Sequence, residues 1–188
     1  MVGEYFQKRN LSFKDKIFAL DYSLIFLVLL LGVISFFAMY SSEQGKFGYH
    51  TQGHIYRFFI FFTLFIAGSF FRIHIWFKFT YIFYFIVLIL LFVVDFYGVT
   101  ASGSKRWLNL FFINIQPSEL MKVALIMFLA KYYYKIPTEN VVNIKYIITP
   151  FFVLLVPVIL VASQPDLGTA LLIAVSGLAV IWLTGFRI

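Results

Sequence analysis

Six long apolar runs, separated by short polar stretches, dominate the hydrophobic pattern of this chain. They cover residues 22–40, 55–71, 79–94, 117–134, 146–162 and 167–186. Each run approaches the ~17–25 residues of a membrane-spanning helix and is too long for a barrel strand of ~9–11 residues. The pattern predicts an all-α fold, a polytopic transmembrane helical bundle with these six runs as its spans. Because no linker divides it, residues 1–188 are expected to form one integral-membrane domain.

Composition and charge support this interpretation. Hydrophobic residues make up 62% of the chain and charged residues 12%, and a soluble domain of this size could not bury so much apolar surface. If the N-terminus is cytoplasmic, ten of the 15 Lys and Arg lie on the inner side and four on the outer side, with Lys122 inside a run. The positive-inside rule therefore predicts a cytoplasmic N-terminus. This bias explains the net charge of +7 without nucleic acid as a partner.

The sequence indicates neither a metal site nor a disulfide. Cys is absent, and the three His residues, at positions 50, 54 and 74, lack the spacing of metal ligands. We therefore predict no metal site. No cofactor is evident; a divalent cation stays open, but no sequence pattern supports one.

The segment "NIQPSELMK" begins the fourth run with several polar residues. Pro117 suits the first turn of a helix, Gln116 is a candidate cap, and Glu119 lies near the positive end of the helix dipole. Lys122 follows Glu119 by three residues, a spacing that favours an ion pair one turn deeper in the run. The segment is either a well-formed helix start or, with Ser118 included, part of a polar cavity that faces the bundle interior.

The segment "SQPDLGTALLIAVSG" repeats this arrangement before the sixth run. Gln164 precedes Pro165, which is expected at the first helical position, with Asp166 in the first turn. Again both a helix start and a polar site fit the pattern. Behind it, small residues allow another helix to approach closely. They are Gly168, Ala170, Ala174 and Gly177.

The segment "GSKRWLNL" lies in the polar stretch before the fourth run. Lys105, Arg106 and Trp107 are typical of an interfacial anchor, since Trp favours the membrane interface and basic side chains reach toward water. They also suit a site for an anionic lipid head group, because Arg binds phosphate through two hydrogen bonds and Trp offers a stacking surface. Asp95, at the end of the third run, is a candidate partner for either base.

Taken together, these segments resemble the SEDS family of cell-wall proteins, the RodA/FtsW/SpoVE group. The resemblance rests on "SGSKRWLNL", "IQPSELMKVAL" and "ASQPDLGTALLIAVSGLAVIWLTG", three motifs in the order and at the separations of the family. It covers essentially the whole chain. The segment "VVDFYGVTASGSKRW" looks more like the rod-shape branch, represented by RodA, than the cell-division branch.

The resemblance implies a peptidoglycan glycosyltransferase of the bacterial inner membrane, which polymerises lipid II for cell-wall elongation and cell shape. It implies as partners a class B penicillin-binding protein, a transpeptidase, and other membrane proteins of the elongation complex. Lys105 and Arg106 are of the right kind to stabilise the leaving diphosphate. Family members resemble bundles of about ten spans, and their catalytic aspartate follows the region covered here. The catalytic base is therefore unknown, and neither Glu119 nor Asp166 matches it.

Two other functions stay open. A polar-lined bundle can carry lipid II across the membrane, although a transporter needs polar residues along its whole path and these cluster toward the outer ends of the runs. A scaffold fragment that binds partner helices through small-residue faces is the non-catalytic alternative. Under the leading hypothesis the chain is the N-terminal part of a glycosyltransferase, and it is inactive by itself.

Overall fold

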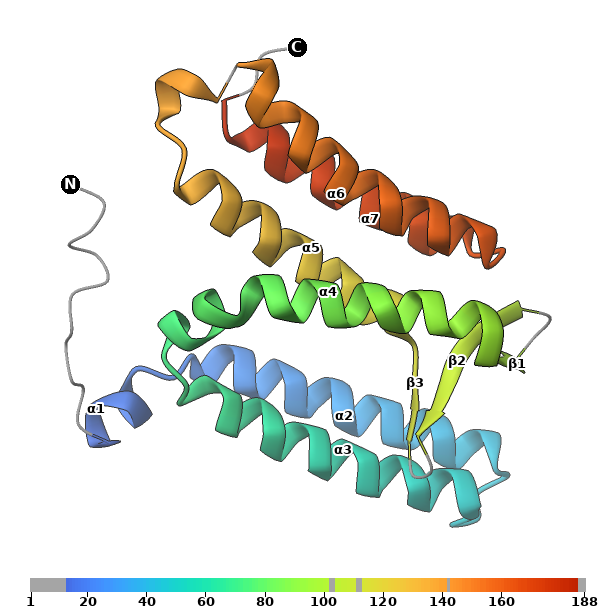
Figure 1. Cartoon of the computed structure of the whole chain (residues 1–188). Coiled ribbons are helices and arrows are strands. Elements are labelled where there is room, and N and C mark those ends of the chain that lie inside the picture. Colours follow the sequence, from blue (N-terminus) through green and yellow to red (C-terminus); the bar gives the residue numbers. More distant parts are fainter. Residues whose placement is uncertain (1–12, 102–103, 111–112, 142, 186–188) are drawn as a thin grey trace. The chain divides into compact units, whose positions relative to one another are not determined.

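The computed structural model of the chain describes residues 13–101, 104–110, 113–141 and 143–185. The chain divides into two compact units, Met1–His74 and Ile75–Ile188. Long helices make up most of both units, as Figure 1 shows, so the predicted all-α class is confirmed.

The first unit is a hairpin of two long helices. A short helix, α1 (Phe13–Phe18), precedes α2 (Tyr22–Ser42) and α3 (Tyr49–Ser69). The carboxylate of Asp21 caps α2 by accepting a hydrogen bond of 3.0 Å from the Leu24 backbone N–H. The hydroxyl of Ser35 and the ring of His54 lie 3.0 Å apart and join α2 to α3.

Glu43 caps the start of α3 from the preceding loop. The cap residue Gly48 has no side chain to do so, and the Glu43 carboxylate instead accepts hydrogen bonds of 3.0 Å each from the backbone N–H groups of His50 and Thr51. It also accepts one from the Thr51 hydroxyl. Two of the otherwise unpaired N–H groups of the first turn are satisfied in this way. The hydrogen bonds, led by that from the Thr51 hydroxyl, lower the pKa of Glu43 below its ordinary 4.5.

We expect protonation of Glu43 to loosen the start of α3. Because its folded-state pKa is lowered, the stabilisation is complete above pH 4.5 and is lost as the pH falls through the lower native value. At neutral pH, hydrogen exchange at the His50 and Thr51 amides should be faster in Glu43→Gln than in the parent, and the ratio of the two rates should approach one in acid. Glu139→Gln, which removes a carboxylate from another loop, is the control. A ratio that stays constant through the titration would contradict this role.

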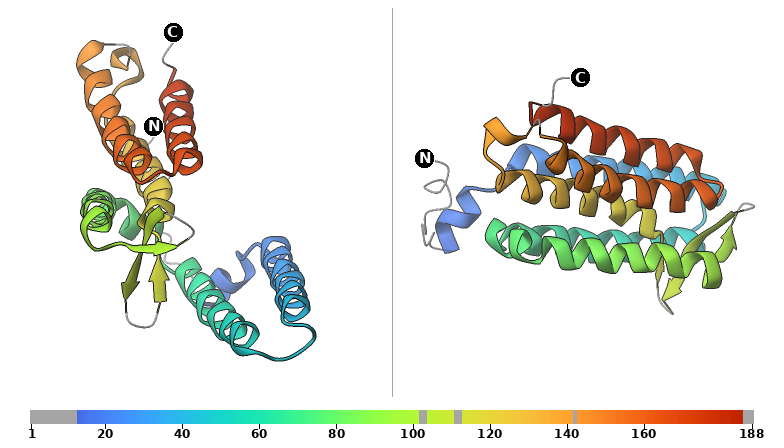
Figure 2. Two further views of the ribbon diagram at one scale, coloured as in Figure 1. Left: turned by 90° about the vertical axis from the view of Figure 1, so that its right-hand side faces the viewer. Right: turned by 45° about the horizontal axis from the view of Figure 1, so that its top comes forward.

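The second unit contains four long helices and a small sheet. In chain order these are α4 (Ile73–Tyr97), whose first turn begins just before the unit boundary, three strands, α5 (Pro117–Tyr134), the one-turn helix η2 (Thr138–Asn140), α6 (Ile144–Ser163) and α7 (Leu167–Leu183). Figure 2 shows α6 and α7 side by side and antiparallel.

The six long helices overlap the six apolar runs: α2, α3, α4 and α6 are longer than their runs, α5 has the same bounds, and α7 ends at Leu183. α4 extends the run 79–94 at both ends, because polar residues such as His74 and Asp95 are tolerated where a helix nears the interface. Within the described residues, three helices are long and apolar enough to cross a membrane, namely α2, α4 and α6; α7 is apolar but shorter. The number of spans in this chain stays a prediction, and Phe186, the expected end of the last run, lies outside the described residues.

The strands are a feature that the helical prediction lacked. β1 (Val99–Ala101), β2 (Ser104–Leu110) and β3 (Ile113–Ile115) form an antiparallel sheet in the order β1-β2-β3. Leu108 of β2 is buried, whereas Lys105 and Asn109 are exposed. The segment "SKRWLNL" is too short to stand out beside six long apolar runs.

α5 lies at the centre of the second unit. Met121, Leu125 and Leu129 recur every four residues on one face of α5 and are completely buried, as are Leu91 of α4 and Ile173 of α7. A stripe with this period is what a helix presents to a core.

Large side chains join α4 to its neighbours. The rings of Tyr81 and Tyr84 pack against Phe128 of α5 at centroid distances of 4.7 and 4.8 Å. The Tyr84 hydroxyl donates a 2.7 Å hydrogen bond to the carbonyl of Val153 in α6. That carbonyl has no donor within its own helix, because the residue four positions later is Pro157, which lacks an N–H. Tyr84 therefore satisfies a backbone group that the proline leaves unpaired.

Lys131, near the end of α5, contacts residues near the start of α4. Its ammonium donates a 3.0 Å hydrogen bond to the Lys78 carbonyl and lies over the rings of Tyr81 and Phe77, 4.4 and 5.1 Å from their centroids. The residue is buried. In the positive-inside count, Lys131 was one of the cations on the inner side of the membrane. In the structure its ammonium packs against aromatic rings through cation–π contacts.

Gly177 marks the closest approach of α7 to its neighbours. A Cβ at this position would lie 2.5 Å from Leu154 Cδ1 and 3.1 Å from Leu125 Cδ2. Gly168, in contrast, has nothing within 4 Å. The packed face of α7 thus contains Ala170, Ile173 and Gly177, and the proposed pair of Ala170 with Ala174 describes it only in part, since Ala174 is half-buried.

Candidate functional site

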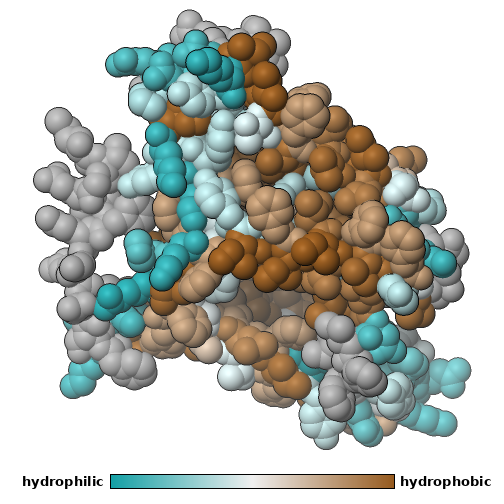
Figure 3. All heavy atoms as spheres, in the orientation of Figure 1, coloured by the Kyte–Doolittle hydropathy of each residue, from teal (hydrophilic) through white to brown (hydrophobic). Residues whose placement is uncertain are grey.

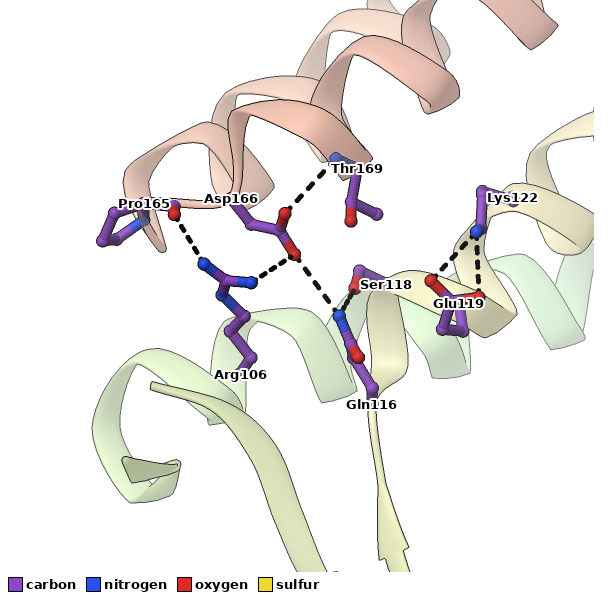
Figure 4. A network of polar contacts seen from close by, with 8 residues as sticks. All are labelled: Arg106, Gln116, Ser118, Glu119, Lys122, Pro165, Asp166 and Thr169. Carbon is purple, nitrogen blue, oxygen red and sulfur yellow. Dashed lines mark hydrogen bonds and ion pairs between the residues drawn. The ribbon is translucent and has the colours of Figure 1, made fainter. Parts of the chain in front are cut away.

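A polar network joins the three motif segments at one end of the second unit. Arg106 comes from β2, Gln116 precedes α5, and Asp166 precedes α7. Their side chains converge on the Asp166 carboxylate, as Figure 4 shows. Residues 50 to 60 positions apart in the sequence are thereby brought into contact.

Asp166 is the N-cap of α7. Its Oδ1 accepts a 3.3 Å hydrogen bond from the backbone N–H of Thr169, and the helix begins at Leu167. The expectation that Pro165 opens the helix with Asp166 in its first turn is wrong. A carboxylate that accepts from the third N–H of the helix is among the best caps, so the helix begins one residue after it.

Arg106 reaches from the sheet to the start of α7. One guanidinium nitrogen, Nη2, donates a 2.9 Å hydrogen bond to the Pro165 carbonyl, while Nη1 lies 3.6 Å from Asp166 Oδ2. The side chain is one-third exposed, and its Nε is buried without a hydrogen-bond partner among the described residues. One further donor on Arg106 thus remains unused.

A bulge in β2 sets Arg106 apart from Lys105 and Trp107. Lys105 pairs with Thr100 and Trp107 with Val99 of β1, so Arg106 is the extra residue between them. Lys105 is exposed and makes no ion pair within the described part of the chain, and Trp107 is half-buried. Asp95, the partner expected for one of the two bases, pairs with neither of them. Of the three consecutive residues, Arg106 is the one that joins the network around Asp166.

Gln116 links the start of α5 to Asp166. It occupies the N-cap position, as predicted, but its side chain accepts no hydrogen bond from a backbone N–H of the first turn. Its amide Nε2 instead donates to Ser118 Oγ at 3.1 Å and to Asp166 Oδ2 at 3.3 Å. Pro117 follows at the first helical position and is buried together with Ser118. The helix start and the polar site are thus the same group of residues.

Glu119 and Lys122 form a separate ion pair farther along α5. Lys122 Nζ lies 2.9 Å from both carboxylate oxygens of Glu119, as their spacing predicted. Their side chains are 55% and 27% exposed, so in this chain the pair lies on the surface of the unit. Neither residue contacts Asp166 in Figure 4.

Gln164 ties α6 to α4. Its buried amide donates a 3.0 Å hydrogen bond to the backbone carbonyl of Leu91, 73 residues earlier in the chain. Gln164 is the C-cap of α6 and does not start α7. No sequence pattern indicates the Leu91 acceptor, because every residue has a backbone carbonyl. Thr169, in contrast, could have been found from the "DLGT" spacing, which places an N–H three residues after a capping carboxylate.

The network brings polar and charged side chains together at one end of the second unit. Asp166 receives donors from three segments, which holds β2, the start of α5 and the start of α7 together. Its carboxylate is fully engaged, whereas Lys105 is exposed and makes no ion pair with a described residue. Such an exposed cation suits the binding of an anionic group. In the described part of the chain, no three His, Cys, Asp or Glu side chains are close enough together to hold a metal ion.

Several known proteins are similar to this chain in sequence. The peptidoglycan glycosyltransferase MrdB of Escherichia coli K12 is 39% identical over 103 residues, which are 54% of this chain and 27% of that protein. MrdB of Helicobacter pylori is 33% identical over 173 residues, or 87% of this chain and 42% of that protein. A probable peptidoglycan glycosyltransferase FtsW of Escherichia coli O6:H1 is 36% identical over 101 residues, or 54% of this chain and 24% of that protein.

Solved structures share the fold. The rod shape determining protein RodA of Thermus thermophilus superposes with a TM-score of 0.79 at 26% identity, over 90% of this chain and 55% of that one. A peptidoglycan synthase complex, described as coordinating polymerization and crosslinking, gives 0.78 at 26% identity, over 89% of this chain and 48% of that one. The chain thus spans about half the length, or less, of these relatives.

The fold and the motifs agree with a family-level match over nearly the whole chain. The family model described as FTSW/RODA/SPOVE cell cycle protein matches residues 18–188. With the apolar helices and the structural likeness to RodA, this match identifies a multi-pass membrane protein. The chain belongs to the FTSW/RODA/SPOVE family of cell cycle proteins.

Proposed function

We propose that this chain supplies substrate-facing helices of a peptidoglycan glycosyltransferase, which polymerises lipid II during cell-wall elongation and maintains cell shape. The observation that carries the proposal is the network of Arg106, Gln116 and Asp166, because it assembles three separate motifs into one polar site. The MrdB relatives of Escherichia coli and Helicobacter pylori, named peptidoglycan glycosyltransferases, support the same activity.

The proposed reaction is glycosyl transfer between lipid-linked sugars. A sugar hydroxyl of one lipid II attacks the anomeric carbon of a second chain, the bond to undecaprenyl diphosphate breaks, and the diphosphate leaves with the bonding electrons. A base accepts the hydroxyl proton, and positive charge stabilises the leaving group. Lys105 is the exposed cation for the second role, and Arg106 positions the strand that carries it.

We do not assign the role of catalytic base to either carboxylate near the site, Asp166 or Glu119. Asp166 already accepts hydrogen bonds from Gln116 and Thr169 and pairs with Arg106, and Glu119 pairs with Lys122. Both carboxylates are thus occupied by contacts within the chain. We therefore place the base outside these residues, in agreement with the family resemblance.

The proposed setting is the bacterial inner membrane with a cytoplasmic N-terminus, and the proposed partner is a class B penicillin-binding protein. The excess of Lys and Arg on one side supports this orientation. The partner follows from the structurally similar peptidoglycan synthase complex, which couples polymerization to crosslinking. Other membrane proteins of the elongation machinery are further candidate partners.

Transport of lipid II is the second candidate function. Within the described residues of the second unit, the ion pairs lie at the start of α7 and in the first turns of α5, whereas Lys131, near the end of α5, donates to a backbone carbonyl. A transport path needs polar groups through the full depth of the membrane. This distribution favours polymerisation.

Polymerisation of lipid II by purified protein tests the proposal. Since the chain matches about half of RodA, we expect no glycan from the chain alone. We expect glycan from a chimera in which the chain replaces the matching segment of Helicobacter pylori MrdB, with or without the partner transpeptidase. Intact MrdB is the positive control, and Lys105→Ala in the chimera should lower the yield about tenfold, as for a lost contact to developing charge.

Three results would contradict the proposal. A chimera that melts cooperatively but makes no glycan would separate this chain from polymerisation. Movement of labelled lipid II across vesicle membranes without polymer would favour transport. Glycan from the chain alone would show that a base is present among its own carboxylates.

A further inference from the structure

The turn between α6 and α7 is held by hydrogen bonds to two other segments of the second unit. Arg106 of β2 donates to the Pro165 carbonyl at 2.9 Å. The buried amide of Gln164 donates to the Leu91 carbonyl of α4 at 3.0 Å. Asp166, on which the polar network converges, follows directly in the sequence. The position of this turn therefore decides whether the network can form.

Pro157 makes the end of α6 dependent on contacts with other helices. A proline inside a helix removes one backbone hydrogen bond and bends the helix. Here the Val153 carbonyl loses its donor, and in Figure 3 the surface over α6 and α7 is largely hydrophobic, as for helices that face lipid. Water is absent at such a depth and cannot satisfy the carbonyl. The direction of α6 after Pro157 is therefore set from outside the helix.

Helix α4 contacts α6 on both sides of this proline. Before it, the Tyr84 hydroxyl donates to the Val153 carbonyl at 2.7 Å. After it, Gln164 donates to the Leu91 carbonyl. Tyr84 and Leu91 are buried and lie about two turns apart on one face of α4, so the two contacts fix the bend of α6 against that face. Because α4 continues through β1 into β2, the same stretch of chain also supplies Arg106.

We infer that Gln164 is a positioning residue of the candidate site. Its hydrogen bond to Leu91 holds the end of α6, and with it the start of α7, where Arg106 of β2 reaches them. Arg106 in turn positions the strand that carries Lys105. Gln164 is 5% exposed and its amide is bonded to a backbone carbonyl, so it acts through the turn and does not touch a substrate. The effect on glycosyl transfer rests on the proposed function, whereas the effect on the position of β2 does not.

A distance between two spin labels on the purified chain tests the positioning. The chain has no Cys, so Asn109→Cys on β2 and Gly168→Cys in the first turn of α7, both at exposed positions, give two unique labelling sites. Gln164→Met keeps the length of the side chain and removes its donor. We expect this variant to shift or broaden the distance by ~2 Å or more, the scale of a loop rearrangement. Ser163→Ala is the matched control, because Ser163 is exposed and its hydroxyl donates to the Leu160 carbonyl within α6.

Gln164→Glu distinguishes a lost hydrogen bond from a general defect in folding. A protonated carboxyl group can donate to the Leu91 carbonyl, whereas an ionised one cannot. We expect the distance in Gln164→Glu to match that of the parent in acid and to broaden over the pH range in which the carboxyl group loses its proton. Gln164→Met should stay broad at every pH.

Polymerisation by the chimera tests the consequence for the site. Gln164→Met should lower kcat about tenfold with little change in KM, because a misplaced cation no longer meets the charge that develops on the leaving diphosphate. In this background Lys105→Ala should lower the rate by no more than ~2-fold, since the two changes remove the same contribution.

Three results would overturn the inference. They are an unchanged distance in Gln164→Met, an equal change in Ser163→Ala, and a full tenfold effect of Lys105→Ala in the Gln164→Met background. An inactive parent chimera would count against the proposed function alone, because the distances are measured on the chain itself.

Discussion

Asp166→Ala is expected to destabilise the second unit and to abolish polymerisation by the chimera. The variant removes the cap of α7, which contributes ~0.5–2 kcal/mol, and the hydrogen bond from Gln116, which contributes ~0.5–1.5 kcal/mol. The partly exposed contact with Arg106 adds at most ~1 kcal/mol. We therefore expect a loss of ~2–3 kcal/mol, measured by thermal unfolding in detergent, with loss of glycan because β2 is no longer held against α7.

Asp166→Asn separates the contributions of cap and charge. Asparagine caps helices as well as aspartate does, so this variant should keep the stability of α7 while it loses the ionic part of the contact with Arg106. A double-mutant cycle of Asp166→Asn with Arg106→Gln should give a coupling energy of ~0.5 kcal/mol or more if the guanidinium binds the carboxylate. Full glycan yield from Asp166→Ala in the chimera would remove the network from the proposed function.

Gly177→Val is expected to weaken the packing of α7 against α5 and α6. The new Cβ would lie 2.5 Å from Leu154 Cδ1 and 3.1 Å from Leu125 Cδ2, so both leucines must move. Overpacking of this kind costs ~1–3 kcal/mol. We expect a corresponding fall in the melting temperature of the purified chain, and partial recovery in the double variant Gly177→Val, Leu154→Ala.

Gly168→Ala is the control for the same helix. Nothing lies within 4 Å of a Cβ at position 168, so the substitution should be neutral or slightly stabilising through helix propensity. Gly177→Ala, the equivalent change at the packed position, should be less stable than Gly168→Ala. Equal melting temperatures of these two variants would mean that α7 does not approach Leu154 and Leu125 as the structure describes.

The positions and kinds of the long helices could be predicted from the sequence because a membrane helix is specified locally. A long apolar run must pair its own backbone groups, so its length and composition are enough to indicate a helix. The first turn of α5 at Pro117 and the pair of Glu119 with Lys122 were likewise predictable, since they depend on spacings of one to three residues. The strands were missed because each of them covers only a few residues.

The composition of the candidate site could not be predicted in the same way. Lys105, Arg106 and Trp107 were grouped because they are consecutive, yet β2 has a bulge at Arg106, and Arg106 is the one of the three that joins the network around Asp166. Asp166 was expected inside a helix that in fact begins after it. These corrections depend on whether a segment is strand, turn or helix, and in polar loops the sequence does not decide this.

The sequence by itself determined a helical membrane protein, the order of its long helices, the three motifs that relate it to the FTSW/RODA/SPOVE family, and the local ion pair on α5. Only the tertiary structure decided that Arg106 reaches Pro165 across 59 residues, that Gln164 bonds to the Leu91 carbonyl across 73, and that Gly177 is the packed glycine of α7. The physical reason is the distance along the sequence over which each interaction acts. Helix formation and i, i+3 pairing are fixed by neighbouring residues, whereas contacts between distant segments depend on how whole helices pack.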